Sequence, residues 1–157
     1  MTLLHSACHN GHMDVVKYLI EEKSTHSSYD GWTTLHFACQ NGYLVVARYL
    51  IQEQDCNPAC ENNSGWTPLH SASEYGHTAV VQYLVNEQYC STTCRNMNGW
   101  TPLRLACRNG HIGVAEYFME SYDIADVDSD GCTPLHLACQ SGHLDLVKTL
   151  HGRRHNL

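Results

Sequence analysis

The sequence predicts an all-α repeat fold in which about five helix–turn–helix units stack into an elongated solenoid. A thirteen-residue stretch, Gly65 to His77, recurs three more times with few changes, and a shorter copy opens the chain. A second apolar run follows every copy. The glycine that opens each full copy recurs at intervals of 34, 34 and 32 residues, at Gly31, Gly65, Gly99 and Gly131. Self-similarity at a fixed period of this length is the sequence signature of stacked repeats.

The recurring stretch has the residue types of a short helix with defined ends. Thr67 is a good N-cap, because its hydroxyl can accept a hydrogen bond from a free N–H of the first turn. Pro68 then falls at the first helical position, where its missing donor costs nothing. His70 occupies the position that a capping box gives to Glu or Gln, and Gly76 suits the left-handed residue that closes a helix. A helix of about two turns results, which is too short to be stable alone in water.

The apolar run that follows predicts a second short helix in each unit. In the third copy it consists of Val80, Val81, Leu84 and Val85. Each unit is therefore a helix pair with one apolar face, and neighbouring units must cover that face.

The helix pairs and the turns between them divide the chain into one domain of repeats. We expect helix pairs at residues 2–23, 30–54, 64–88, 98–120 and 130–151. The turns between them, called fingers below, are expected at 24–30, 55–64, 89–98 and 121–130, where Asn, Asp, Ser and Gly are frequent. The approximate repeat boundaries are 1–29, 30–63, 64–97, 98–129 and 130–157. The first repeat lacks its finger, and the last is expected to be a polar cap.

The Thr-Pro-Leu-His-x-Ala core at 67–72, together with a period near 33, resembles the ankyrin repeat over nearly the whole chain. The resemblance implies an ankyrin-type solenoid with projecting β-turn or hairpin fingers and no cofactor. It also implies a non-enzymatic module that binds another protein through the concave surface of the inner helices and fingers. Two alternatives stay open: a structural spacer or targeting domain from a larger protein, and an effector directed at a host.

Composition excludes two classes of partner. The 9 basic and 16 acidic residues give a net charge of −7, which disfavours binding to a nucleic-acid backbone. No apolar stretch approaches the roughly 20 residues of a membrane span. The first five residues lack the basic segment that begins a signal peptide. We therefore expect a monomer in the cytoplasm or nucleus that binds neither nucleic acid nor membrane.

The nine cysteines are interpreted as packing residues. Four of them occupy one slot after the helix alanine, where the third copy has Ser73: Cys8, Cys39, Cys107 and Cys139. A slot that takes Cys or Ser favours a small buried side chain, and free thiols favour a reducing compartment.

One set of cysteines has a spacing that zinc could in principle use. Cys56 and Cys60 form a Cys-x-x-x-Cys pair that recurs 34 residues later at Cys90 and Cys94. Structural zinc sites more often have a two-residue gap, and in the register of the resemblance the first pair matches two finger alanines. We therefore favour packing over metal. The histidines recur at fixed slots, so neither a catalytic triad nor a thiol enzyme is expected.

The candidate binding residues are those that vary between copies on the inner helices, together with a row of tryptophans. The variable residues are Phe37, Gln40, Asn41, Ser71, Glu74, Tyr75, Leu105, Arg108 and Asn109. The Trp row consists of Trp32, Trp66 and Trp100, each of which follows a finger glycine. These indoles either pack finger against finger or line a groove for a partner.

Arg104 takes the place of the capping histidine in the fourth copy, and Arg108 lies one turn further on. Two arginines on one face of an acidic protein suggest a contact for an acidic group of the partner. The alternative is an intramolecular pair between Arg108 and Glu74, which occupies the same slot one repeat earlier.

Overall fold

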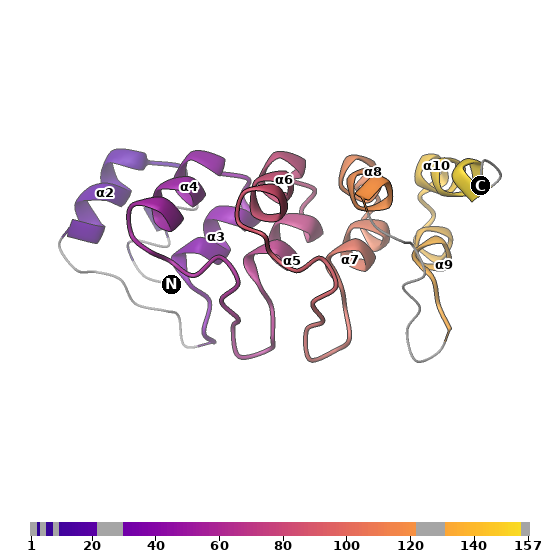
Figure 1. Cartoon of the computed structure of the whole chain (residues 1–157), viewed down its shortest axis with the longest axis horizontal. Helices are drawn as coiled ribbons and strands as arrows, with labels where there is room; N and C mark the ends of the chain where they lie inside the picture. The colour runs from indigo at the N-terminus through magenta and orange to yellow at the C-terminus, as the bar shows by residue number, and fades with distance from the viewer. Residues whose placement is uncertain (1–2, 4–5, 8–9, 22–29, 122–130, 155–157) are drawn as a thin grey trace.

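The computed structural model describes residues 3, 6–7, 10–21, 30–121 and 131–154 as an elongated stack of helices in two rows (Figure 1). The second helices of the repeats form one row: α2 (Met13–Glu21), α4 (Leu44–Gln52), α6 (Thr78–Asn86), α8 (Ile112–Ser121) and α10 (Leu144–Arg154). The first helices form the other row: α3 (Thr34–Gln40), α5 (Pro68–Glu74), α7 (Pro102–Arg108) and α9 (Pro134–Gln140). The predicted all-α repeat solenoid is confirmed.

The first helices begin where the sequence predicts. In α5, the Thr67 N–H donates to Nδ1 of His70 (3.1 Å), and the His70 N–H donates back to the Thr67 hydroxyl (3.3 Å). The same reciprocal capping box opens α3 at Thr33 and α9 at Thr133. A histidine therefore serves in the box position that Glu or Gln usually fills.

The capping histidines also join one repeat to the next. Because Nδ1 accepts a hydrogen bond, the ring proton lies on Nε2, which donates to a carbonyl of the following finger base. The bond runs from His36 to the Trp66 carbonyl oxygen (2.8 Å) and from His70 to that of Trp100 (3.0 Å). Burial lowers the pKa of His36 to about 4, against the hydrogen bond to Trp66, and it also lowers the pKa of His70. Both rings are therefore neutral at pH 7.

A second series of histidines crosses the same boundaries beside the helix ends. His111 Nε2 donates to the Glu74 carbonyl oxygen (2.7 Å), and His77 and His143 make the equivalent bonds to Gln40 and Arg108 (both 2.9 Å). Each ring lies against the glycine that closes the first helix of the preceding repeat. At Gly76, which has φ +78, an added Cβ would lie 2.5 Å from Nδ1 of His111.

The core fills the space between the two rows. Its fully buried side chains include Leu35, Leu50, Leu69 and Leu84. Cys39, Cys107 and Ser73 are buried, which confirms the small-residue slot for the middle repeats. Cys139 is exposed, because no further repeat covers it among the described residues, and Cys8 lies outside them.

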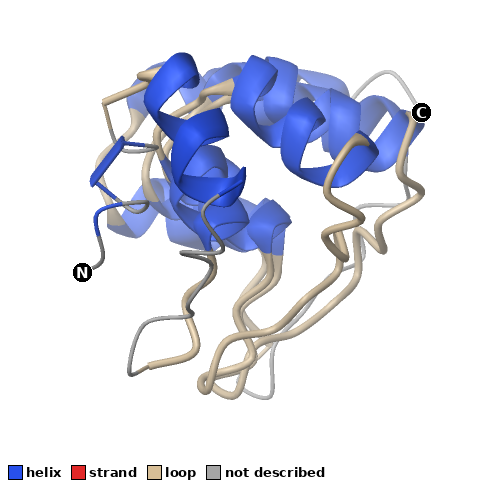
Figure 2. Cartoon of the chain, turned by 90° about the vertical axis from the view of Figure 1, so that its left-hand side faces the viewer, coloured by secondary structure: helices blue, strands red, loops and turns tan. Residues whose placement is uncertain are grey.

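The described fingers project together to one side of the helices (Figure 2). Each closes as a hairpin-like turn without an assigned strand in the described residues, and Asn62 N–H donates to the Trp66 carbonyl oxygen (2.9 Å). Neighbouring fingers are joined by backbone bonds from Asn63 to Asp30 (3.1 Å) and from Met97 to Ser64 (3.0 Å). The predicted turns at 24–30 and 121–130 lie almost wholly outside the described residues.

Thr34 begins α3 at the position where α5, α7 and α9 begin with proline. We expect Thr34→Pro to stabilise the fold by about 0.4–1 kcal/mol, because proline fits the first helical position and restricts the unfolded chain. Thermal unfolding monitored by circular dichroism tests this, with Thr34→Ala as the control for loss of the buried threonine side chain. A lower melting temperature in the proline variant than in the alanine variant would contradict the expectation.

Candidate functional site

A groove of about 430 Å³ lies between the second and third repeats, where the finger bases meet the first helices. It is lined by Asp30, Trp32, Phe37, Gln40, Trp66, Glu74 and Tyr75. Helix α3 contributes Phe37 and Gln40, while Glu74 and Tyr75 stand at the end of α5. Six of these seven residues are among the sequence-predicted binding residues. Asp30 was missed, because it precedes the conserved-looking repeat stretch and has no counterpart of its type at Ser64 or Asn98.

Aromatic rings form the walls of the groove. The ring centroid of Trp32 lies 6.2 Å from that of Trp66 and 5.7 Å from that of Phe37. The two indoles also contact the capping histidines of their own repeats, at 5.3 Å for His36 and 5.9 Å for His70. Tyr75 is 48% exposed. Trp32 and Trp66 therefore do both things that the sequence left open: they pack against each other, and they line the groove.

Glu74 and Asp30 place two carboxylates at this groove. Burial raises the pKa of Glu74, and the charge of Arg108 acts in the opposite direction. Among the described residues, neither carboxylate has an ion pair within 4 Å. The alternative interpretation of Arg108 as a direct partner of Glu74 is therefore wrong, although the two charges interact at longer range.

Arg108 instead lies over Trp100, the third member of the Trp row. Its guanidinium carbon is 5.0 Å from the Trp100 ring centroid, and that of Arg104 is 5.5 Å away. Such positions are typical of cation–π contacts. Arg108 is exposed, so its charge remains accessible from solvent.

The prediction that they contact a partner is wrong for three residues, because their side chains are buried. Ser71 is 0% exposed, Leu105 is 2% exposed and Arg104 is 3% exposed. Variation between copies at the slots of Ser71 and Leu105 does not require exposure. Arg104 Nη1 donates to the Cys132 carbonyl oxygen (3.1 Å), which replaces the bond of the capping histidine. The predicted acidic contact at Arg104 is therefore not available to a partner.

Asn41 closes the end of α3 and Asn109 closes the end of α7. The side-chain amide of Asn41 donates to the Phe37 carbonyl oxygen (2.8 Å), and that of Asn109 donates to the Leu105 carbonyl oxygen (2.9 Å). Each of these carbonyls also accepts the backbone N–H of the same asparagine, so the side chain adds a second bond at the helix end. Neither asparagine lines the groove, so their role as contact residues stays a prediction.

The paired finger cysteines contact the capping boxes. Cys60 Sγ lies 3.6 Å from the Thr33 hydroxyl, and Cys94 Sγ lies 3.9 Å from that of Thr67. Burial raises the pKa of both thiols, and that of Cys90 to about 11. Metal ligation and nucleophilic attack both require a thiolate. These contacts favour the packing interpretation.

We expect the Cys-x-x-x-Cys pairs to be metal-free and reduced in the purified protein. Treatment with EDTA should leave the melting temperature unchanged, because no zinc contributes to folding. A structural zinc would contribute much of the folding free energy, so its removal would lower the melting temperature by several degrees. One zinc per chain in metal analysis would contradict the packing interpretation.

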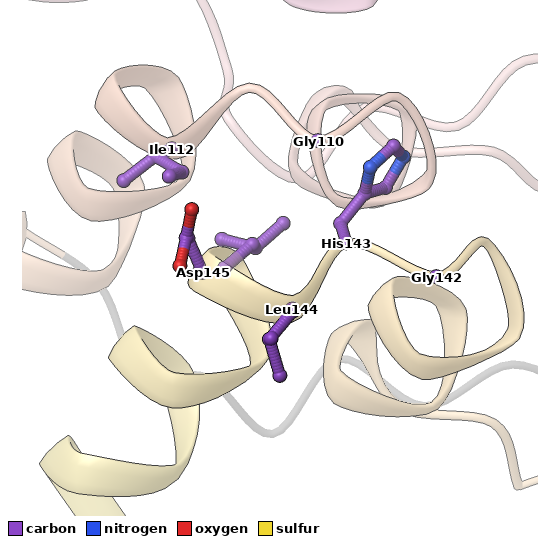
Figure 3. Close-up of a pocket in the computed structure, with 7 residues that line it drawn as sticks. Gly110, Ile112, Gly142, His143, Leu144 and Asp145 are labelled. Atoms are coloured by element: carbon purple, nitrogen blue, oxygen red, sulfur yellow. The ribbon is translucent and has the colours of Figure 1, made fainter.

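A second hollow of about 380 Å³ lies between α8 and α10, next to His143 (Figure 3). The His143 ring already donates to the Arg108 carbonyl oxygen. The other labelled side chains include Ile112, Leu144 and Asp145. A single carboxylate beside an engaged histidine offers no arrangement for acid–base chemistry.

Comparison with known families gives matches along the whole chain. The family described as ankyrin repeats (3 copies) matches residues 1–60, 54–127 and 88–157. The comparison with curated proteins gives no match. Within the described residues, no helix is sufficiently long and apolar to span a membrane. The overlapping matches cover the chain from end to end, and they agree with the stacked helix pairs, the histidine caps and the projecting fingers: the chain belongs to the ankyrin repeat family.

Proposed function

We propose that this ankyrin repeat protein is a non-enzymatic binding module whose partner is another protein. Ankyrin repeats are generally protein–protein interaction modules. The proposed surface is the groove together with the adjoining Trp100 and Arg108. We further propose that the chain acts as a monomer in the cytoplasm or nucleus.

One observation carries the choice of surface: the groove gathers three kinds of side chain typical of binding hot spots. Two tryptophans and a tyrosine line it, and an arginine stands beside it. Trp, Tyr and Arg are enriched among the residues that dominate binding energy. The groove also lies over α3 and α5, which are packed against each other and anchored by histidine bonds. A surface held in this way loses little conformational freedom when a partner binds, which favours affinity.

The test is a titration against the partner captured from the native cell. We expect the double variant Tyr75→Ala plus Arg108→Ala to bind at least about tenfold more weakly, since truncating a hot-spot anchor costs roughly 2 kcal/mol or more. Both side chains are exposed, so the variant should keep its circular dichroism spectrum.

The control replaces two tyrosines in the other row of helices. Tyr49 of α4 lies under Lys17, and Tyr83 of α6 is buried under Arg48. Tyr49→Ala plus Tyr83→Ala should therefore lower stability more than binding. Unchanged affinity in the first variant, or lost binding without unfolding in the second, would place the contact surface elsewhere. A spacer function would leave both variants without any effect on association.

A further inference from the structure

We propose that the groove receives an arginine side chain of the partner polypeptide, which lies over the Trp66 indole and pairs with the carboxylates of Asp30 and Glu74. The inference rests on the proposed protein-binding function and specifies the chemistry of the group that the partner presents.

The fourth repeat already shows the aromatic half of this arrangement within the chain, an arginine over a member of the Trp row. There, the guanidinium of Arg108 lies over Trp100 at 5.0 Å from the ring centroid. The residues 34 positions earlier are Glu74 and Trp66. At the third repeat the cation is thus replaced by a carboxylate, and no Lys or Arg lies over the Trp66 ring among the described residues. The Trp row can accommodate a guanidinium, and at Trp66, where Trp32 and His70 are the ring neighbours, no described side chain supplies one.

The charge of the groove selects a cation. Glu74 is half-buried and Asp30 is exposed at the rim, and neither has an ion pair among the described residues. Burial of Glu74 raises its pKa, so the site disfavours an uncompensated carboxylate charge, which a bound cation would stabilise. Arg108 lowers that pKa from a distance but stays over Trp100. The chain as a whole carries a net charge of −7, which also favours a basic partner segment.

The shape of the groove favours arginine over lysine. The Trp32 ring centroid lies 5.7 Å from that of Phe37 and 6.2 Å from that of Trp66, so the groove presents a row of flat rings. A planar guanidinium stacks on such rings and can still bind a carboxylate in its own plane. An ammonium group makes a point contact and is more strongly hydrated. The groove offers both the aromatic face and the carboxylates that a guanidinium needs.

The three indole N–H resonances make the experiment specific to individual residues. The ¹⁵N-labelled chain is titrated at pH 7.5 with the capped pentapeptide Gly-Ser-Arg-Ser-Gly, and separately with peptides that carry citrulline or lysine in place of arginine. Citrulline has the size and shape of arginine without its charge. The arginine peptide should shift the Trp66 resonance in a saturable way, and citrulline should bind at least about fivefold more weakly through loss of cation–π and ionic contacts.

Matched variants use the relation between the two repeats. Glu74→Arg should abolish the Trp66 shift, because the new side chain lies over Trp66 as Arg108 lies over Trp100. Glu74→Gln keeps the shape and should weaken binding about fivefold through loss of the carboxylate. Arg108→Glu should keep the Trp66 shift, while Arg104 stays over Trp100. Circular dichroism checks that each variant folds, and wild-type protein with the citrulline peptide tests the charge without any substitution.

Equal shifts with arginine and citrulline, or with arginine and lysine, would overturn the assignment, as would binding retained in Glu74→Arg or no shift at Trp66. None of these outcomes bears on whether a protein binds the concave surface. That question is decided by the captured partner and the Tyr75→Ala plus Arg108→Ala variant, which involve no arginine peptide.

Discussion

Gly76→Ala should destabilise the protein by about 2–5 kcal/mol, whereas Gly142→Ala should cost only about 1–2 kcal/mol. Both glycines close a first helix with nearly the same left-handed backbone, φ +78 and φ +76. An L-residue in that conformation carries the same strain at either position. At Gly76 the new Cβ also meets the His111 ring at 2.5 Å, whereas at Gly142 no described atom lies within 4 Å. The difference between the two variants therefore measures the contact between repeats.

Urea unfolding of both variants gives the two free energies. A third variant, Gly76→Ala with His111→Ala, removes the ring that the new methyl group meets. If the contact is responsible, the double variant should be more stable than the sum of its single changes predicts, and the coupling energy gives its magnitude. Equal losses at Gly76 and Gly142 would show that His111 moves aside without cost.

Acidification from pH 7 to pH 4 should remove about 3 kcal/mol of stability through His36 alone. Burial lowers the pKa of this ring from its ordinary 6.5 to about 4 in the folded protein, against the hydrogen bond to Trp66. Between these two values the unfolded chain binds more protons than the folded chain, so protonation favours unfolding. The stability is fully present above pH 6.5 and is lost as the pH falls toward 4. The lowered pKa of His70 acts in the same direction.

The measurement is the free energy of unfolding in urea at several pH values. Glutamine also fits the capping-box position but does not titrate, so His36→Gln should flatten the slope between pH 6.5 and 4. His136→Gln controls for the exchange of histidine for glutamine in a capping box, because His136 holds the same position in α9 but is exposed. An unchanged slope in His36→Gln would assign the acid sensitivity to other groups.

The fold could be predicted because its signals are local and repeated. The capping box joins Thr67 to a residue three positions away, and the same pair of residue types recurs in other copies of the repeat. The surface could not be predicted to the same degree. Ser71 and Leu105 vary between copies and are nonetheless buried, so variation at a slot does not reveal whether solvent reaches it.

Arg104 shows the limit of local reasoning most directly. Its place one turn before Arg108 on the same helix of an acidic protein suggested a contact for an acidic group of a partner. Its carbonyl partner belongs to Cys132, 28 residues away in the next repeat. Only the stacked arrangement brings the two together. Asp30 was missed for a similar reason, since its place at the groove depends on the preceding finger and the following repeat meeting there.

Arginine replaces the capping histidine at the boundary between the fourth and fifth repeats, so the described boundaries do not all respond to protonation in the same way. At Trp66 and Trp100 the joining imidazole also has to keep Nδ1 unprotonated, because that nitrogen accepts the capping bond of its own helix, whereas the joint at Cys132 uses a guanidinium whose charge does not change in the physiological range. Acid therefore opens the capping boxes of α3 and α5 from within, while Arg104 keeps its hydrogen bond to the Cys132 carbonyl oxygen.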